Sequence, residues 1–228
     1  MDINVRKEKI LAIAVLLSII LSCCKKNDYK IIQTLNFLYP ITIYPTSDTI
    51  VKGDTLWITL DIADSLYDNL TNKKYYLPNY NFYTYFFVAK INDKIKNLSE
   101  QEYASEKFTV HSITGNIIKT GAFSIDFTPV YENHRYKLMG GIIPNDTGVF
   151  SIRTQNLTFG DKIPISKLDL GKDINGHQLI AGIGLINSLI NEKNTHYDLF
   201  LKYCKSGNTT DLNEWKEENT TYTFVVKP

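Results

Sequence analysis

The residues best suited to catalysis or metal binding are few and far apart in this chain. Its four histidines are scattered, and none has a metal-ligand spacing such as H-E-x-x-H. The chain has no G-x-S-x-G nucleophile motif and no complete glycine loop for binding phosphates. The sequence therefore predicts no catalytic residue, no metal site and no cofactor. A pair of carboxylates that are distant in sequence but meet in the fold, as in glycosidases, remains open.

One cysteine, Cys23, is placed for a different chemistry, the acylation of its thiol. The segment before it has three basic residues between positions 6 and 9, an apolar run over 10–21, and the small residue Ser22. This order is typical of a secretory signal. The apolar run is shorter than the roughly 20 residues that a membrane-spanning helix needs. We therefore expect residues 1–22 to be a signal peptide.

The residues Ile20-Leu21-Ser22-Cys23 resemble the lipobox of bacterial lipoproteins. This resemblance implies cleavage before Cys23 and lipid attachment to its thiol, with Cys24 as the alternative site. Several acyl chains on one cysteine would meet the requirement for stable anchoring, since each buried methylene contributes about 0.8 kcal/mol and one chain binds only reversibly. Residues 23–30 would then be a tether that holds the folded part of the protein at a membrane.

The residues Lys26-Asn27-Asp28, just after the lipobox, loosely resemble a short charged export signal of Bacteroidota-type lipoproteins. In those bacteria the signal directs lipoproteins to the outer face of the outer membrane. The resemblance implies a lipid-anchored outer-membrane protein, with the cell surface favoured over the periplasmic face.

The charge balance excludes one large class of partners. The chain has 25 basic and 24 acidic residues, and removal of residues 1–22 leaves 22 of each. Binding to nucleic acid or through a polybasic membrane patch requires an excess of positive charge. We therefore expect the partners to be the membrane, through Cys23, and a glycan or protein ligand, with no nucleic acid.

Tyrosine is the residue type that most suggests a binding surface. The chain has 15 Tyr and 11 Phe but only 2 Met, and many tyrosines fall in one stretch. Exposed rings suit sugar faces and protein hot spots because they bury much area with few rotatable bonds. The alternative is that these rings fill the core or cover its edge. The candidate platform residues are Trp57, Tyr75, Tyr76, Tyr80, Tyr83 and Tyr85.

Alternating apolar residues predict the strands that must position these side chains. Leu56, Ile58, Leu60 and Ile62 alternate with a second set, Thr55, Trp57, Thr59 and Asp61, after a Gly-Asp turn signal. This strand, Gly-Asp-Thr, strand opening resembles the first hairpin of the immunoglobulin-like modules of bacterial surface lipoproteins. Similar patterns predict strands over 41–44, 48–51, 82–91, 108–113, 123–127, 136–143, 149–153 and 221–226, with a bulge at Gly140-Gly141 and a hairpin between 136–143 and 149–153.

The pattern after residue 158 differs from the alternation before it. Leu179, Ile183, Ile186 and Ile190 follow one another in steps of four, three and four, which predicts one face of a helix. Tyr197, Phe200, Leu201 and Cys204 predict the inward face of a second short helix. The fold class expected is mainly β: an immunoglobulin-like antiparallel β-sandwich over 31–157, with a mixed, partly helical extension over 158–228 that packs on it and a final returning strand.

These observations leave three classes of function. The first is a membrane-anchored, non-enzymatic binding or accessory module of the cell envelope, which resembles accessory lipoproteins of Bacteroidota uptake systems. The second is a structural subunit of a surface fibre or envelope complex, which would need an open sheet edge. The third is an enzyme, most plausibly a hydrolase, which would need a cleft with paired carboxylates or clustered histidines.

Overall fold

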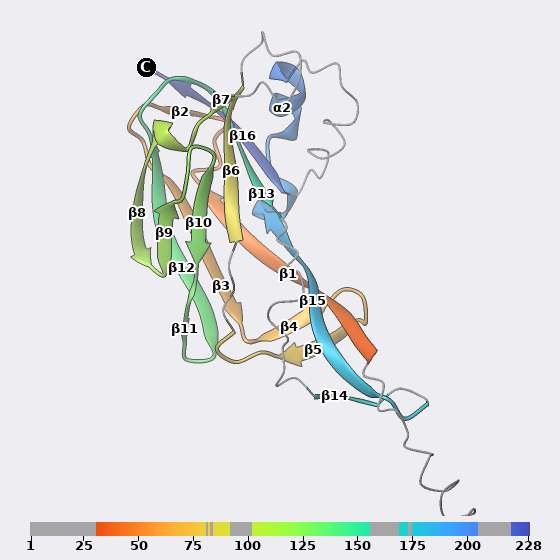
Figure 1. Cartoon of the computed structure of the whole chain (residues 1–228). Helices are drawn as coiled ribbons and strands as arrows, with labels where there is room; N and C mark the ends of the chain where they lie inside the picture. Colours follow the sequence, from red (N-terminus) through yellow and green to blue (C-terminus); the bar gives the residue numbers. More distant parts are fainter. Residues whose placement is uncertain are drawn as a thin grey trace, which may run out of the picture.

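Two β-sheets packed face to face form the body of the protein in the computed structural model (Figure 1). The structure describes residues 31–80, 82, 84–91, 102–155, 169–172, 175–204 and 220–228. The expected signal peptide 1–22 and tether 23–30 lie outside these residues. The mainly β, sandwich-like fold predicted from the sequence is confirmed, as are a short C-terminal helix and the final strand.

The nine strands of the first sheet are β1 (Ile31–Tyr44), β3 (Leu56–Ala63), β4 (Ser65–Asp68), β5 (Lys73–Tyr76), β8 (Phe108–Thr114), β11 (Val130–Glu132), β12 (Arg135–Pro144), β14 (Asp169–Lys172) and β15 (Gln178–Ile190). The seven strands of the second sheet are β2 (Thr49–Val51), β6 (Thr84–Ile91), β7 (Glu102–Tyr103), β9 (Asn116–Lys119), β10 (Ser124–Thr128), β13 (Gly148–Gln155) and β16 (Thr221–Lys227). Helix α2 (Tyr197–Tyr203) and two 3-10 helices (Ser105–Lys107 and Asn191–Lys193) complete the described elements.

The central strands follow the order of an immunoglobulin-type sandwich. The order β12-β3-β1 in the first sheet corresponds to strands E-B-A of that fold, and β16-β13-β6 in the second sheet to strands G-F-C. The turns at 52–55 and 145–147 join strands of different sheets, because β2 pairs with β16 while β3 pairs with β12. The two hairpins predicted at these turns are therefore wrong, and both turns instead connect the layers of the sandwich.

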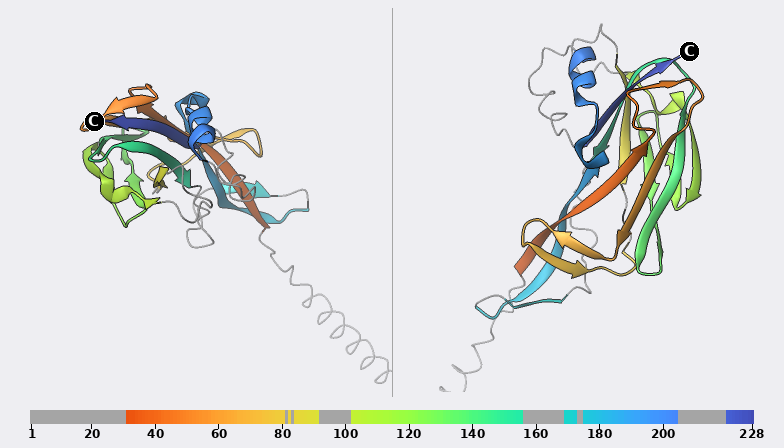
Figure 2. Two further views of the ribbon diagram at one scale, coloured as in Figure 1. Left: turned by 90° about the horizontal axis from the view of Figure 1, so that it is seen from above. Right: turned by 180° about the vertical axis from the view of Figure 1, so that it is seen from behind.

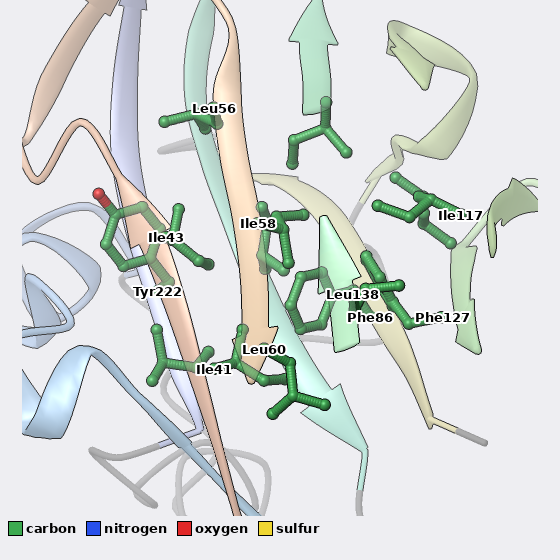
Figure 3. Close-up of a cluster of buried hydrophobic side chains, with 14 of the residues drawn as sticks. Ile41, Ile43, Leu56, Ile58, Leu60, Phe86, Ile117, Phe127, Leu138 and Tyr222 are labelled. Atoms are coloured by element: carbon green, nitrogen blue, oxygen red, sulfur yellow. The ribbon is translucent and has the colours of Figure 1, made fainter. Parts of the chain in front are cut away.

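Apolar side chains from the two sheets meet in one core (Figure 3). The strict alternation of β3 turns Leu56, Ile58 and Leu60 inward, as the sequence predicts. The second sheet contributes large rings, such as Phe86 and Phe127, whose centroids lie 4.2 Å apart. Burial raises the pKa of the Tyr222 hydroxyl to about 12, because the ring lies among these apolar groups.

Strand β1 is much longer than the predicted strand over 41–44, and Pro40 explains the difference. The backbone N–H and C=O of Asn36 form hydrogen bonds on the side of β1 that faces β4. The backbone N–H and C=O of Ile43 bond instead to the side chain of Asn191, which follows β15 on the other side of β1. The even-numbered residues from 36 onward therefore face β3 and β4. Pro40 lies between the β4 contact at Phe37 and the β3 pairing that begins at Thr42. Its missing N–H therefore costs no described ladder bond.

The predicted helix over 179–190 is wrong, because Gln178–Ile190 is strand β15. It pairs in parallel with β1 from Ile31–Leu179 to Ile41–Ile190, with one register shift at Leu35/Asn36. A continuous apolar run cannot be assigned to a helix or a strand from periodicity alone. Gly182 and Gly184 weaken a helix, and a long unpaired edge of β1 offers the run a ladder of backbone hydrogen bonds instead.

The second predicted helix and the final strand are confirmed. Helix α2 buries Phe200, and Cys204 at its end is also buried, against Ala89 and Ile91 on the outer face of β6. Leu201, expected to face inward, is instead exposed. Strand β16 lies between β2 and β13, so the C-terminal part of the chain contributes strands to both sheets.

The predicted bulge at Gly140-Gly141 is confirmed as a register shift between β12 and β8, at Met139/Gly140. Strand β8 approaches β12 closely there, and a Cβ at Gly140 would overlap the carbonyl oxygen of His111 and a methyl group of Ile117. Glycine is thus required by the space and not by its backbone angles.

We expect Gly140→Ala to lower the free energy of unfolding by about 1–3 kcal/mol, because the methyl group must displace backbone in a packed sheet. Urea unfolding of the mature chain measures this. Gly121→Ala is the matched control, since the nearest atoms lie 4.0 Å from its Cβ position, and it should change stability by less than about 0.5 kcal/mol. Equal effects of the two variants would contradict the packing argument.

Candidate functional site

The candidate platform residues are spread over both sheets. Trp57, half-buried on β3, stacks on Tyr44 of β1 with ring centroids 6.4 Å apart. Tyr85 lies on β6 in the other sheet, where its burial and the nearby carboxylate of Asp126 raise the pKa of its hydroxyl. Tyr83 and the lipidation candidate Cys23 lie outside the described residues. Trp57 and Tyr85 are therefore not parts of one surface.

The other three candidates lie near one another but face different ways. Tyr75 and Tyr80 are half-buried and pack against the core, Tyr75 on Phe37 and Tyr80 on Phe82. Burial raises the pKa of the Tyr80 hydroxyl. Tyr76 is 53% exposed, and its hydroxyl lies 3.4 Å from His134 Nδ1. Two of the five tyrosines in this stretch, Tyr75 and Tyr80, thus pack on the core, which is the alternative that the sequence left open.

A different set of rings forms the clearest exposed cluster on the described surface. Phe87 of β6, Tyr103 of β7 and Phe123 before β10 have ring centroids 5.6–5.8 Å apart. Tyr103 is 53% exposed and Phe123 is 42% exposed, while Phe87 is half-buried beneath them. We call these three residues the aromatic patch. It lies on the outer face of the second sheet, where β6 turns Phe87, Ala89 and Ile91 away from the core.

The backbone beneath the aromatic patch is held by a dense set of hydrogen bonds. Phe123 O accepts a bond of 2.8 Å from Val88 N, and Ala122 O accepts one of 3.0 Å from Ser105 N. The buried Ser105 hydroxyl donates to Gly121 O, and the Thr120 hydroxyl donates to the buried Asp126 carboxylate at 2.6 Å. Phe123 therefore belongs to a turn that hydrogen bonds hold in place, and Ser105 ties the segment just after Tyr103 to the same turn.

Sequence reasoning missed this patch because its three residues come from separate segments. A signal was present in β6, which is apolar at nearly every position. A sandwich strand buries only one face in its own core, so the second face needs another cover. Helix α2 covers Ala89 and Ile91, and Phe87 packs at the border of that cluster and contacts the rings of Tyr103 and Phe123.

A carboxylate–imidazole pair lies at another place, where β3 ends. The buried Asp64 accepts a hydrogen bond of 2.6 Å from the Tyr131 hydroxyl, and His134 Nδ1 lies 3.1 Å from the same oxygen. Burial alone would raise the pKa of Asp64, but the bonds from Tyr131 and His134 outweigh it and hold this pKa below its usual value. The pKa of the Tyr131 hydroxyl shifts the opposite way: its hydrogen bond to Asp64 and its burial both raise it.

The Asp64–His134 pair is built to fix a corner of the fold. His134 has a left-handed backbone, with φ of 62°, in the turn between β11 and β12. Its carbonyl accepts a bond of 3.0 Å from Asp64 N, so backbone and side chain both tie this turn to the end of β3. The imidazole is held in a fixed orientation, but its side chain is 76% exposed to solvent.

One hollow, of about 520 Å³, opens beside α2. Asp48, Asp198, Lys202 and His196 line it, so it has the residue types of a hydrolytic site. Both ring nitrogens of His196 are engaged, however: Nδ1 lies 3.0 Å from Thr223 O and Nε2 lies 2.9 Å from Thr46 O. The ring donates to at least one of these carbonyls, so this imidazole ties the start of α2 to β16 and to the segment before β2.

Comparison of the chain with protein-family models, with curated proteins and with solved structures gave no match. Within the described part of the chain, no three His, Cys, Asp or Glu residues come together as a metal site. The described helices are all too short or too polar to cross a bilayer.

The Asp64 pair predicts a pH-dependent contribution to stability. Because the pKa of Asp64 is lower in the folded protein than the usual 3.8, its stabilising effect is present above about pH 4 and is lost as the pH falls through the folded-state pKa. We expect Asp64→Asn to be less stable than the wild type at pH 7, and this difference to shrink below about pH 4.

Urea unfolding at several pH values measures this difference. Tyr131→Phe, which removes one donor and keeps the ring, should change stability in the same direction by a smaller amount. A stability difference between Asp64→Asn and wild type that is the same at pH 7 and pH 3 would exclude the carboxylate as its source.

Proposed function

We propose that this protein is a lipoprotein of the outer membrane, anchored through acylated Cys23, that acts as a non-enzymatic binding module. The observation that carries the proposal is the aromatic patch of Phe87, Tyr103 and Phe123. Large exposed rings on a fixed backbone are the residues that dominate binding energy at protein interfaces. Their rigidity keeps the entropy cost of binding low.

The position of the patch suits a tethered binding module. The described chain begins with Ile31 at one end of the molecule, and β7 lies at the opposite end of the sandwich (Figures 1 and 2). A tether attached before Ile31 would therefore join the membrane to the end of the molecule opposite the patch. A ligand could reach Tyr103 without meeting the lipid surface.

The ring geometry favours a protein ligand over a glycan. The planes of Phe87 and Tyr103 are inclined by 78°, and those of Tyr103 and Phe123 by 53°. The planes of Phe87 and Phe123 are inclined by only 31°, but Phe87 is half-buried, so the two exposed rings offer no common flat face on which a sugar could stack. We therefore propose an envelope or extracellular protein with a complementary pocket as the partner.

We expect Tyr103→Ala and Phe123→Ala each to weaken binding of this partner at least about tenfold, since a central aromatic hot spot contributes 1.4 kcal/mol or more. Both side chains are exposed, so the folded state should be retained. A photo-crosslinking amino acid at position 103 in intact cells, followed by mass spectrometry, would identify the partner.

Position 113 on β8 is the matched control, because Ile113 is 51% exposed but belongs to the other sheet. An adduct from position 103 that is absent from position 113 and lost in Phe123→Ala supports the proposal. A polysaccharide adduct, or equal adducts from both positions, would contradict it. Loss of acyl labelling in Cys23→Ser tests the anchor separately.

The outer edge of β15 favours a structural subunit as the second candidate. Among the described residues, β14 pairs with β15 only at Gln178 and Ile180, and no strand pairs with that edge over 181–190. These residues include no charge and no proline, which are the features that blunt an edge strand. Strand addition there would give assemblies that grow with concentration. A constant monomeric mass in light scattering would exclude it.

A further inference from the structure

The β4–β5 hairpin lies at the end of the molecule where the described chain begins (Figures 1 and 2). Strand β4 meets β1 at the antiparallel pair Phe37–Asp68, and Asn69 N donates to Asn36 O at 2.9 Å. After Asp68 the chain therefore runs toward the start of β1. With a rise of about 3.3 Å per residue, the turn after β4 lies on the order of 15 Å from Ile31.

This end of the molecule exposes apolar side chains that the fold does not use. Tyr67 is 44% exposed and Leu70, in the turn, is 59% exposed, although their neighbour Leu66 is buried in the core. Ile31 and Ile32 at the start of β1 are 40% and 66% exposed. Single exposed apolar residues are ordinary, but a group at one end of a molecule marks a contact surface.

The charged groups of the hairpin divide between its surface and its interior. Lys73 and Lys74 are exposed on β5. The hairpin has one acid, Asp68, which is fully buried and accepts bonds from Asn36 N and from the backbone and hydroxyl of Thr71. Burial would raise the pKa of Asp68, but these bonds outweigh it and hold the pKa below its usual value. Consecutive strand residues point to opposite faces, so the two lysines give the end of the hairpin positive charge on both faces, and the hairpin has no exposed acid.

We propose that this basal surface, formed by Ile31, Ile32, Tyr67, Leu70, Lys73 and Lys74, rests on an anionic lipid bilayer. Tyr67 and Leu70 enter the headgroup region, where amphipathic rings and exposed apolar groups are stabilised. Lys73 and Lys74 bind lipid phosphates, which attract cations near the surface. Two lysines are fewer than a polybasic segment contains, so they orient a protein that is anchored by other means.

A lipid bilayer is the expected partner of the basal surface because only a short segment separates that surface from Cys23. The proposal therefore rests on the acylation of Cys23. Eight residue steps separate Cys23 from Ile31, and even a fully extended chain of that length spans at most about 28 Å. The acylated cysteine therefore keeps Ile31, which belongs to the basal surface, within that distance of the bilayer. Contact then needs little additional affinity, because the tether makes it an intramolecular step.

The bond network of Asp68 makes the hairpin a rigid contact. Its carboxylate joins β1 to the β4–β5 turn, and the Tyr67 hydroxyl donates to Asn72 Oδ1 across that turn at 2.7 Å. A turn held in this way presents Leu70 and the two lysines in one fixed arrangement. The hairpin can therefore set the orientation of the sandwich on the membrane.

The test uses the full acylated chain in vesicles of phosphatidylethanolamine and phosphatidylglycerol. A fluorescent amino acid is introduced at position 70 or, as control, at position 113 on β8, and lipids spin-labelled near the headgroup act as quenchers. We expect quenching at position 70 to be at least about threefold stronger than at position 113. Omitting phosphatidylglycerol or adding salt should weaken it.

The charge is tested by Lys73→Glu together with Lys74→Glu, which should lower the quenching at position 70 at least about threefold. The matched control is Lys52→Glu together with Lys227→Glu, since both lysines are exposed beside β2 and β16 at the opposite end; it should leave quenching unchanged. Urea unfolding confirms that each variant is folded.

Equal quenching at positions 70 and 113 in acylated protein would overturn the basal surface and leave the anchor intact. Quenching that persists without phosphatidylglycerol or after lysine reversal would overturn the role of anionic lipid. A protein adduct from a photo-crosslinker at position 70 in cells, in place of lipid, would overturn the bilayer as occupant. Absence of an acyl chain on Cys23 would instead contradict the proposed function on which this inference rests.

Discussion

Strand β1 is the element on which the rest of the structure depends. Its alternate side chains from Leu35 to Ile43 are all buried in the shared core, while its two edges pair with β3, β4 and β15. Five buried side chains of this size contribute on the order of 10 kcal/mol, which is comparable to the whole net stability of a typical domain. The strand nearest the expected membrane anchor is thus a central strand and cannot separate without unfolding the sandwich.

The parts of the fold that could be predicted from sequence are those whose local pattern and tertiary role agree. Strand β3 alternates strictly because one of its faces is buried, and the glycines at 140–141 mark a close approach between strands. Strand β15 could not be assigned, because its apolar spacing fits a helix face while its real constraint is the unpaired edge of β1, far away in sequence. The first half of β1 was not predicted for a similar reason. Pro40 is tolerated in this strand only because its backbone nitrogen lies between the contact with β4 and the pairing with β3, where no ladder hydrogen bond is needed.

The candidate site was less predictable than the fold, because exposure depends on contacts between distant segments. Tyrosines crowded into one stretch suggested a platform, yet Tyr75 and Tyr80 pack on the core. The aromatic patch instead combines residues 87, 103 and 123, which only the pairing of β6 with β7 and β10 brings together. The Asp64–His134 pair likewise joins residues 70 positions apart. Spacing in the sequence does not predict such pairs. The apolar residues on both faces of β6 do indicate that its outer face must be covered by other side chains.

The aromatic patch and the basal surface are linked functionally because the sandwich between them is rigid. A flexible tether alone would let the domain rotate freely above a bilayer, so the aromatic patch would face the membrane for part of the time. A hairpin fixed to β1 through Asp68 and resting on lipid would remove most of that rotation. Because one continuous core joins β1 to β6, a fixed orientation at one end fixes the direction of the patch at the other. Orientation of this kind raises the effective concentration of the binding surface toward partners outside the membrane without any change in its intrinsic affinity.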